Sequence, residues 1–404
     1  MIIAGEPSGD MLAAELIAAL KAAPQMRAQP FPPAFFGAGG ACLAAEGVEL
    51  AIDLTEHAIF GIAEVLTQYL KFRRFFWQLV GLAISRRPDV IILVDYSGFN
   101  LRFAKAVKQH VRAQSKSFNN WRPKIVYYVS PQVWASRSAR ARSIAKNVDL
   151  LLSIFPFEKE WYAARVPQLP VEFVGHPMVD RYASNRHSPQ ATPREQRADE
   201  SSSAPLLLLL PGSRKRELEA HLPTVIAAAH QIKARKPVRL RMVLPGPELV
   251  SFALNCIQPQ PDIEIQTGRL GESLAEASLA IAASGTVTLE CAYFGVPTVV
   301  LYKTSRLTHA IARRIIQVPY IAMPNILAGE RVFPEFIQSA ATPENISREA
   351  LDLLTNIVRR TTIKEKLAAL IRSLGPPGAA TRAAEAILRR LPPGPDLRAH
   401  LLGQ

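Results

Sequence analysis

The stretch LLLLLPGSRKREL, residues 206–218, passes in a single step from five leucines to a Pro-Gly turn, a serine and three cations. An apolar run that ends in Pro and Gly is typical of a strand buried in a parallel sheet. The helix that follows such a turn offers free N–H groups to an anion. Gly212 lets the backbone approach a phosphate, which the Ser213 hydroxyl and the Arg214 guanidinium can bind. The alternative is an exposed turn whose cations are simply solvated.

Seven further runs are rich in leucine or β-branched residues and alternate with helical patterns. They are residues 90–94, 124–129, 150–155, 171–175, 239–244, 279–284 and 297–302. Continuous apolar strands separated by helices predict parallel sheets that are covered on both faces. We therefore expect an α/β fold with two Rossmann-like parallel-sheet domains that face a ligand cleft.

The stretch SNRHSPQATPREQRADESSSAP, residues 184–205, consists mainly of Ser, Pro and charged residues and has no repeating apolar position. Such a composition is typical of a linker. It divides the chain into an N-terminal domain, residues 1–183, and a C-terminal domain, residues 206–375. The tail, residues 376–404, alternates a helical pattern with Pro and Gly, and it can pack back on the first half of the chain.

The charge of the chain limits its partners. The 404 residues include 48 Lys and Arg against 34 Asp and Glu, a formal net charge of +14. This favours an anionic partner, which can be a phosphorylated ligand, a nucleic acid or an acidic membrane surface. The three cysteines lie far apart and indicate a reducing compartment, and no apolar stretch is long and regular enough to span a bilayer. We expect a cytoplasmic protein whose contact with a membrane is peripheral.

A second glycine turn follows an apolar strand in IAASGTVTLECAYFGVP, residues 281–297, at Ser284, Gly285 and Thr286. The helix that begins there is another anion site, and Glu290 lies on the same helical face four residues beyond Thr286. A carboxylate in that position suits the two hydroxyls of a ribose whose diphosphate lies at the helix start. Two such loops in one domain predict a nucleoside diphosphate site. Because the chain has neither a Walker A pattern nor an Asp-x-Asp pair, we expect no metal ion and no cofactor.

The first domain has its own candidate at a strand end. The stretch VIILVDYSGFN, residues 90–100, places Asp95 directly after a buried strand, where parallel sheets bind their ligands. A carboxylate there can accept a proton from an attacking hydroxyl. The alternative is that Asp95 caps the next helix and that Asn100 is a turn residue.

Glycine turns also occur near the N-terminus. In IIAGEPSGD, residues 2–10, Gly5 and Gly9 allow the close approach of a ligand, whereas Ser8 or Asp10 can simply cap the following helix. The stretch FFGAGG, residues 35–40, is a weaker candidate of the same kind, because glycine-rich turns are common after strands.

The stretch YYVSPQVWASRSARARSIAKNVD, residues 127–149, leaves a strand through a loop that contains Ser130 and Gln132. The stretch FVGHPMVDRY, residues 173–182, ends a strand in the same way, and His176 can either contact a ligand or satisfy the backbone at a hinge. The first loop leads into a series of cations that either form a solvated face or bind a phosphate or lipid head group: Arg137, Arg140, Arg142 and Lys146.

Aromatic and basic residues interleave in FGIAEVLTQYLKFRRFFWQLVGLAISRRP, residues 60–88. The segment has more aromatic side chains than one buried stripe can hold, and cations flank them. Such a helix suits insertion at an anionic membrane surface, although a helix buried against the first sheet is the commoner case. The candidate membrane contacts are Phe72, Arg73, Arg74, Phe75, Phe76 and Trp77.

Nine stretches of the chain, in sequence order, resemble the lipid-A-disaccharide synthases, a family of GT-B glycosyltransferases of the Gram-negative outer-membrane pathway. The matching strings are AGEPSGD, GIAEVL, VDYSGFN, YYVSPQVWAS, FPFEKEWY, FVGHPMVD, LLPGSRKREL, ASGTVTLE and MPNILAGERVFPEF, which run from residue 4 to about residue 336. The resemblance implies a GT-B fold and the transfer of 2,3-diacylglucosamine from its UDP derivative to the 6-hydroxyl of 2,3-diacylglucosamine 1-phosphate (lipid X). It implies an inverting reaction that forms a β-1,6 disaccharide and releases UDP.

The resemblance also assigns roles to residues. Asp95 matches the family carboxylate proposed as general base, and this chain departs from the family pattern at Gly98, where a second Asp is usual. The UDP-sugar site implied is Gly212, Ser213, Arg214, Ser284, Gly285, Thr286, Glu290 and Asn325. The acceptor site implied is Ser8, Gly9, Asp10, Asn100, Ser130, Gln132 and His176. The acyl chains of both substrates imply peripheral association with an anionic inner-membrane surface.

Two other functions remain as alternatives. Another GT-B protein that acts on UDP-N-acetylglucosamine, such as the lipid-linked peptidoglycan transferase or the 2-epimerase, shares the C-terminal nucleotide site but is expected to lack SPQVWAS and VDYSGFN as a pair. A nucleic-acid-binding protein also explains the positive charge, but it is expected to gather cations and stacking aromatics in one groove. The basic residues of this chain are scattered. We therefore expect no nucleic-acid partner.

Overall fold

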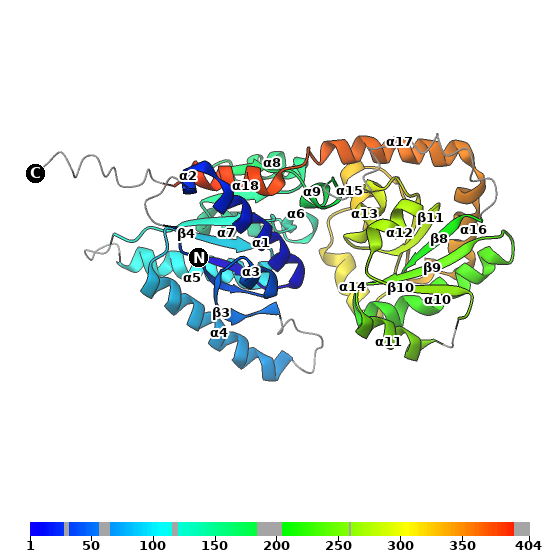
Figure 1. Cartoon of the computed structure of the whole chain (residues 1–404), viewed down its shortest axis with the longest axis horizontal. Helices are drawn as coiled ribbons and strands as arrows, with labels where there is room; N and C mark the ends of the chain where they lie inside the picture. The colour runs from blue at the N-terminus through cyan, green and yellow to red at the C-terminus, as the bar shows by residue number, and fades with distance from the viewer. Residues whose placement is uncertain (28–31, 56–64, 115–119, 184–203, 258–259, 392–404) are drawn as a thin grey trace, which may run out of the picture. The chain divides into compact units, whose positions relative to one another are not determined.

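The computed structural model describes residues 1–27, 32–55, 65–114, 120–183, 204–257 and 260–391 (Figure 1). The chain divides into unit 1, residues 1–177 with 376–404, and unit 2, residues 178–375. Each unit contains one sheet whose strands are all parallel. The predicted α/β class with two Rossmann-like parallel-sheet domains is confirmed.

Unit 1 is built on a seven-stranded sheet in the order β3-β2-β1-β4-β5-β6-β7. Its strands are β1 (Ile2–Ala4), β2 (Phe36–Gly39), β3 (Glu49–Asp53), β4 (Val90–Val94), β5 (Lys124–Tyr128), β6 (Leu150–Ser153) and β7 (Val171–Phe173). The chain adds β2 and β3 on one side of β1 and then returns to its other side for β4. The carboxyl ends of β1 and β4 are therefore the switch point at which doubly wound folds bind ligands.

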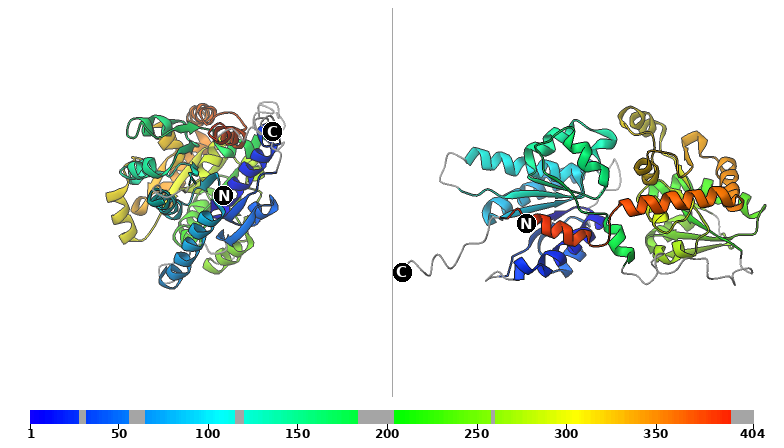
Figure 2. Two further views of the ribbon diagram at one scale, coloured as in Figure 1. Left: turned by 90° about the vertical axis from the view of Figure 1, so that its left-hand side faces the viewer. Right: turned by 90° about the horizontal axis from the view of Figure 1, so that it is seen from above.

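Two helical layers cover this sheet, because alternate residues of each strand face opposite sides. One layer shares a core with Ile3, Leu93 and Tyr127 and contains α4 (Val65–Arg86), α5 (Ser97–Ala113), α7 (Arg140–Asn147) and α8 (Pro156–Ala163). The other layer includes α1 (Pro7–Ala22) and α18 (Ala379–Leu388), which pack side by side although they come from opposite ends of the chain (Figures 1 and 2). The shorter helices are α2 (Pro24–Arg27), α3 (Ala41–Ala45) and α6 (Val133–Ser136).

The described part of the C-terminal tail belongs to unit 1. Helix α18 buries Ala383 and Ile387, and the Arg382 Nε donates to the Val174 carbonyl at 2.8 Å. The guanidinium groups of Arg389 and Arg390 bind the two carboxylate oxygens of Glu172 at 2.7 and 3.0 Å. Apolar burial and ion pairs therefore hold α18 on the fold.

Unit 2 is built on a six-stranded sheet in the order β10-β9-β8-β11-β12-β13. Its strands are β8 (Leu206–Leu210), β9 (Arg239–Leu244), β10 (Ile263–Thr267), β11 (Leu279–Ala283), β12 (Thr298–Tyr302) and β13 (Glu335–Ile337). All five leucines of β8 are buried, as the apolar run predicts for a central strand. The order reverses between β8 and β11, which makes their carboxyl ends the switch point of unit 2.

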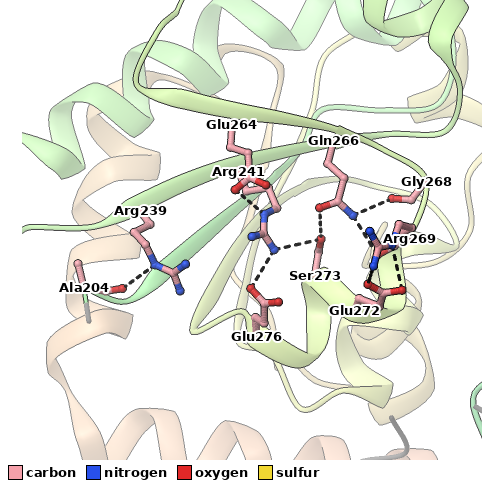
Figure 3. Close-up of polar contacts among 10 residues, drawn as sticks. All are labelled: Ala204, Arg239, Arg241, Glu264, Gln266, Gly268, Arg269, Glu272, Ser273 and Glu276. Atoms are coloured by element: carbon pink, nitrogen blue, oxygen red, sulfur yellow. Dashed lines mark hydrogen bonds and ion pairs between the residues drawn. The ribbon is translucent and has the colours of Figure 1, made fainter. Parts of the chain in front are cut away.

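The helices of unit 2 connect these strands. They are α10 (Lys215–Lys233), α11 (Pro247–Cys256), α12 (Leu270–Glu276), α13 (Val287–Tyr293), α14 (Arg306–Ile315), α15 (Met323–Ala328), α16 (Pro343–Thr355) and α17 (Ile357–Ser373). Figure 3 shows how α12 is fixed to the edge of the sheet: Arg241 of β9 binds Glu264 at 2.8 Å and Glu276 at 3.0 Å. The Ser273 hydroxyl of α12 donates to Gln266 of β10 at 3.2 Å.

The boundary between the units differs from the expected end of the first domain at residue 183. Helix α9 (Pro177–Ala183) belongs to unit 2 from Met178 onward. The Tyr182 ring packs against Tyr293 and Phe294, with centroid separations of 5.3 and 4.9 Å. Of the predicted linker, residues 184–203 lie outside the described residues, and Ala204 and Pro205 lead into β8.

The eight strands expected from the apolar runs are all present, with ends that shift by no more than a few residues. The interpretation of residues 35–40 as a glycine turn after a strand is wrong, because Phe36–Gly39 is β2 itself. Gly37 is required there: a Cβ at this position would lie 1.8 Å from the Ile2 carbonyl oxygen on β1. The glycine thus serves the close approach of two backbones.

Candidate active site

Most of the predicted ligand-site residues lie near the carboxyl ends of strands. In unit 1 they follow β1, β4, β5 and β7, and in unit 2 they follow β8 and β11, whereas Asn325 lies on α15 between β12 and β13.

The chain leaves β4 through two consecutive left-handed residues. Asp95 has φ 46° and Tyr96 has φ 44°, and neither is a glycine. Such residues cost free energy, of order 1–3 kcal/mol each, and persist only where neighbours hold them. Here the Asp95 N–H donates to the Tyr128 carbonyl at 3.0 Å, and the Asp95 carbonyl accepts from the Tyr127 hydroxyl and from the Asn100 amide at 2.9 Å. The turn is therefore fixed by two neighbouring elements, β5 and α5.

The Tyr96 ring covers the loop that follows β1. A Cβ on Gly5 would lie 2.1 Å from this ring, so only glycine fits beneath it. The ring also stacks on Phe99, with centroids 5.8 Å apart. From the sequence, Gly5 was interpreted as a position where the backbone can approach a ligand, and Tyr96 was not expected as a site residue. The contact fastens the ends of β1 and β4 to each other.

The Asp95 carboxyl is suited to act as a base. Burial raises its pKa, the nearby Glu6 carboxylate adds to the increase, and the Tyr96 backbone N–H opposes both. A carboxylate that is deprived of water binds a proton more readily than an exposed one. Gly98, on the first turn of α5, has open space where a Cβ would be, so this chain holds no second carboxylate at that position.

The structure gives Asn100 and Asp10 bracing contacts within unit 1. The Asn100 amide donates to the carbonyls of Val94 and Asp95 at 3.1 and 2.9 Å and ties α5 to the end of β4. The buried Asp10 carboxylate accepts from the backbone N–H groups of Gly40 at 2.7 Å and Cys42 at 2.9 Å, so it caps α3 from α1. Near Asp10 in the first turn of α1, Gly9 is buried and Ser8 is exposed.

The loop after β5 is fixed by a buried polar cluster. Its first residue, Val129, has φ 65°, a rare conformation for a β-branched residue. The Ser130 hydroxyl donates to Tyr162 at 3.2 Å, and the Trp134 indole donates to the Glu158 carboxylate at 2.9 Å. Gln132 is exposed between these anchors. The loop thus presents one free polar side chain on a rigid support.

Glu158 is the central member of that cluster, and sequence reasoning did not single it out. It is fully buried, and burial raises its pKa from 4.5 to about 7, against the hydrogen bonds that it accepts from Trp134 and from the Phe155 backbone. Phe155 in turn packs against the ring of His176, with centroids 5.3 Å apart. His176 is thereby held beside the same cluster.

In unit 2 the loop after β8 is shaped around Glu217, at the start of α10. Gly212 has φ 140°, and a Cβ there would lie 2.6 Å from the Glu217 Cβ. The Ser213 N–H donates to the Glu217 carboxylate at 2.9 Å. The Arg214 guanidinium lies 3.6 Å from the same carboxylate and is 64% exposed. Glu217 thus orients the Arg214 guanidinium, and most of the arginine side chain stays exposed to solvent.

A buried histidine, which the sequence did not indicate, links this loop to the one after β12. His221 of α10 is fully buried, and its Nδ1 lies 2.7 Å from the Pro211 carbonyl oxygen. Its Nε2 accepts from the Lys303 N–H at 3.0 Å, so Nδ1 carries the proton and donates to Pro211. Burial lowers the pKa of this imidazole, which favours the neutral form that both contacts need. His221 therefore fixes the loop after β8 and the loop after β12 relative to each other.

The loop after β11 exposes its glycine and threonine. Gly285 and Thr286 are exposed, whereas the Ser284 hydroxyl donates to the Ile321 carbonyl at 2.8 Å. Glu290, on α13, is mostly buried and accepts from the Tyr182 hydroxyl at 2.9 Å. Burial raises the pKa of the Glu290 carboxyl, while Tyr182 and Arg181 oppose the increase. The predicted ribose carboxylate thus already has one hydroxyl partner of its own.

Asn325 uses all of its hydrogen-bonding capacity inside unit 2. Its amide nitrogen donates to the Phe333 carbonyl and to Glu335, both at 2.8 Å, and its oxygen accepts from the N–H groups of Val332 and Phe333 at 2.9 and 2.7 Å. The residue is fully buried. It joins α15 to the chain that enters β13, and no donor or acceptor is left for a ligand.

The aromatic-basic segment is only partly available to a surface. Residues 60–64 lie outside the described part, and α4 begins at Val65. Phe76 packs edge-on against Phe99 and Phe103, and Phe75 is likewise packed on the core of unit 1. Its exposed residues include Leu70, Lys71, Arg73, Arg74 and Trp77, with Leu70 66% and Trp77 57% exposed. Phe72 is partly exposed.

Within the described residues, no helix combines the length and the apolar character that crossing a membrane requires. In the same part of the chain, no group of three or more His, Cys, Asp or Glu side chains is placed to hold a metal ion.

Comparison with known proteins identifies the relatives of this chain. The family model described as lipid-A-disaccharide synthetase matches residues 1–387. The lipid-A-disaccharide synthase of Myxococcus xanthus is 38% identical over 400 residues, which cover 98% of each chain. That of Trichlorobacter lovleyi is 36% identical over 396 residues and 96% of each chain.

Solved structures with the same fold are more distant. A putative UDP-N-acetylglucosamine 2-epimerase from Listeria monocytogenes matches with a TM-score of 0.56 at 16% identity, over 100% of this chain and 96% of its own. MurG from Acinetobacter baumannii matches with a TM-score of 0.52 at 15% identity, over 96% of this chain and 99% of its own. At this identity the likeness shows the fold alone.

The Glu158 cluster predicts a pH dependence of stability. Because the folded pKa of about 7 exceeds the unfolded value of 4.5, the folded state holds a proton that the unfolded state has lost between these pH values. Stability is fully present below pH 4.5 and decreases as pH rises through 7, by up to about 3 kcal/mol. We expect Glu158→Gln to flatten the dependence of the thermal midpoint on pH in this window. An unchanged slope in the variant would mean that Glu158 does not titrate there.

Proposed function

The chain belongs to the lipid-A-disaccharide synthase family, and we propose that it transfers 2,3-diacylglucosamine from its UDP derivative to the 6-hydroxyl of 2,3-diacylglucosamine 1-phosphate. The products are a β-1,6-linked tetraacyl disaccharide 1-phosphate and UDP. The observation that carries this proposal is a partly buried carboxylate of raised pKa, Asp95, fixed in a left-handed turn at the switch point of unit 1. Family membership supplies the substrates.

In the proposed reaction Asp95 acts as the general base. Its carboxylate accepts the proton of the acceptor 6-hydroxyl while that oxygen forms a bond to the anomeric carbon of the donor. The bond between the anomeric carbon and the UDP oxygen breaks with inversion, and its electron pair leaves with UDP. The raised pKa makes Asp95 a stronger base than an exposed aspartate, which compensates for the missing second carboxylate at Gly98.

The proposal assigns UDP to unit 2. Arg214 offers an oriented cation to the diphosphate, together with the turn at Gly212 and Ser213 and the exposed loop at Gly285 and Thr286. Glu290 accepts from the ribose hydroxyls in place of Tyr182. Ser284 and Asn325 are proposed to act on UDP indirectly. Their side chains already form hydrogen bonds with neighbouring groups of unit 2.

The acceptor is assigned to unit 1. Ser8, Gln132 and His176 are the proposed contacts whose side chains reach the surface at least in part. Asn100 and Asp10 support this surface through the braces that they provide, and Ser130 supports it through Tyr162. Gly9 is buried on the first turn of α1, where a Cβ would make only ordinary contacts, the nearest 3.7 Å from the Val94 carbonyl oxygen.

We also propose that α4 contacts the anionic inner face of the cytoplasmic membrane. Leu70 and Trp77 are large apolar side chains that are mostly exposed on one helix, and Arg73 and Arg74 lie between them in sequence. Helices that bind anionic bilayers insert apolar side chains into the lipid and place cationic side chains beside them against the head groups. Both substrates carry acyl chains, so a protein at the membrane surface meets them where they partition.

The base assignment predicts a selective loss of turnover in Asp95→Asn. Asparagine tolerates the left-handed conformation, so the turn is kept while the proton acceptor is lost. We expect kcat to decrease by at least ~10²-fold, with UDP affinity nearly unchanged by calorimetry. The matched control is Asp89→Asn, an exposed aspartate at the opposite end of β4, which we expect to be fully active. Near-normal turnover of the Asp95 variant would remove it from this role.

The diphosphate assignment predicts weaker UDP binding in Arg214→Ala. Loss of a charge-assisted contact of this kind weakens binding by roughly 10- to 100-fold, and we expect the KM of the UDP-sugar to rise accordingly. Arg216→Ala removes an equally exposed cation two residues further along and serves as the control. If both variants lose affinity to the same extent, the effect comes from overall charge, and the specific contact at Arg214 is rejected.

The membrane assignment predicts reduced vesicle binding in the double variant Leu70→Ser, Trp77→Ser. Withdrawing two large apolar side chains is expected to weaken binding to phosphatidylglycerol-containing vesicles by roughly tenfold or more. The control is Ile357→Ser, Val358→Ser, an apolar pair in unit 2 that is 67% and 78% exposed. Cosedimentation distinguishes them, and a larger loss from the control pair would place the membrane contact on unit 2.

A further inference from the structure

Unit 1 carries a group of three arginines that the reaction described above does not use. Arg102 lies on α5, Arg137 ends α6, and Arg140 begins α7. Helices α5 and α7 pack against each other, and the Arg140 N–H donates to the Arg137 carbonyl at 2.9 Å. The three residues, here called the arginine cluster, therefore lie on three neighbouring elements of unit 1.

The cluster is electrostatically unbalanced. Within the described residues, ion pairs form at many other arginines and lysines, but none includes a member of the cluster. The pKa of the Arg140 guanidinium is lowered by burial and by the charges of Arg137 and Arg102. Desolvation is the larger cause, and the charges of Arg137 and Arg102 add to it because like charges disfavour the protonated form.

The beginning of α7 adds to this imbalance. A helix N-terminus carries a partial positive charge and favours anions, yet α7 begins at Arg140. Its first turn contains no acidic residue, and the side chain of Ala139 provides no cap. Cations at this end of a helix destabilise it, so the arrangement is costly unless an anion binds among them.

The arginine cluster lies next to the proposed acceptor residues along the chain. Helix α5 begins two residues after Asp95, and Arg102 is five residues beyond its start, which is about 8 Å along the helix axis. Arg137 follows the loop of Ser130 and Gln132 after one short helix. In a hexopyranose C1 and C5, which bears C6, both flank the ring oxygen. A sugar that presents its 6-hydroxyl to Asp95 therefore carries its C1 substituent on the neighbouring side of the ring, and that substituent needs its own partner close to Asp95.

We propose that the arginine cluster binds the phosphomonoester of the acceptor sugar. Arginine forks bind phosphate oxygens with two parallel hydrogen bonds, and a phosphate dianion offsets the repulsion among the three cations. This rests on the proposed function and extends it, because it gives the acceptor a second fixed point besides its reacting hydroxyl. The cluster thereby selects a phosphorylated acceptor and sets the orientation of its ring.

The test compares two acceptors, 2,3-diacylglucosamine 1-phosphate and the same sugar without its phosphate. We expect Arg137→Gln and Arg140→Gln each to lower kcat/KM for the phosphorylated acceptor by roughly 10- to 100-fold. For the sugar without phosphate the same variants should change kcat/KM by less than about twofold. The KM of the UDP-sugar should not move. The control is Arg142→Gln, an exposed cation of α7 outside the cluster.

Each outcome is decisive. An equal loss for both acceptors would overturn the proposal, because a structural role does not recognise the phosphate. A loss of binding to phosphatidylglycerol vesicles with unchanged acceptor discrimination would overturn it in favour of a lipid head group. If the wild-type protein forms no disaccharide, the proposed function fails. In that case calorimetry with the two sugars still decides whether the cluster binds the phosphate, since binding needs no turnover.

Discussion

The left-handed turn at Asp95 and Tyr96 is the constraint on which unit 1 depends. It holds a partly buried carboxylate at the switch point, and it exists because the Tyr127 hydroxyl and the Asn100 amide both bind the Asp95 carbonyl. The same turn puts the Tyr96 ring over Gly5 and so fixes the end of β1 to the end of β4. The turn therefore gives the proposed base a defined position, and its partial burial limits its contact with water.

In unit 2, side chains at the start of α10 and within it hold the loops at the strand ends. Glu217 shapes the turn at Gly212, and His221 joins the loops after β8 and β12. Arg214 stays open to solvent at the front. Both units contain buried side chains that hold a loop in place and exposed side chains that are free to meet a ligand. Several residues that belong to sequence motifs are of the first kind.

The sequence predicted the parallel sheets, because buried parallel strands are continuous apolar runs. It missed β2, which was interpreted as a glycine turn, and it missed β3, β10 and β13, which are short or alternate polar with apolar residues. The supports were also missed. The partners of His221 lie 10 residues before it and 82 residues after it in the chain, and no local pattern reports such contacts. Asp10 and Asn325 were identified from motifs, but their saturated hydrogen bonds are visible only in three dimensions.

The central claim is that Asp95, made more basic by its surroundings, accepts the proton of the acceptor. It is tested most directly by the dependence of kcat/KM on pH, since the acid limb reports the pKa of the essential base in the free enzyme. The base works deprotonated, so the rate should fall as pH decreases through a pKa above the ordinary aspartate value of about 3.9. An acid limb that is absent, or one that persists unchanged in the residual activity of an Asp95 variant, would contradict the account.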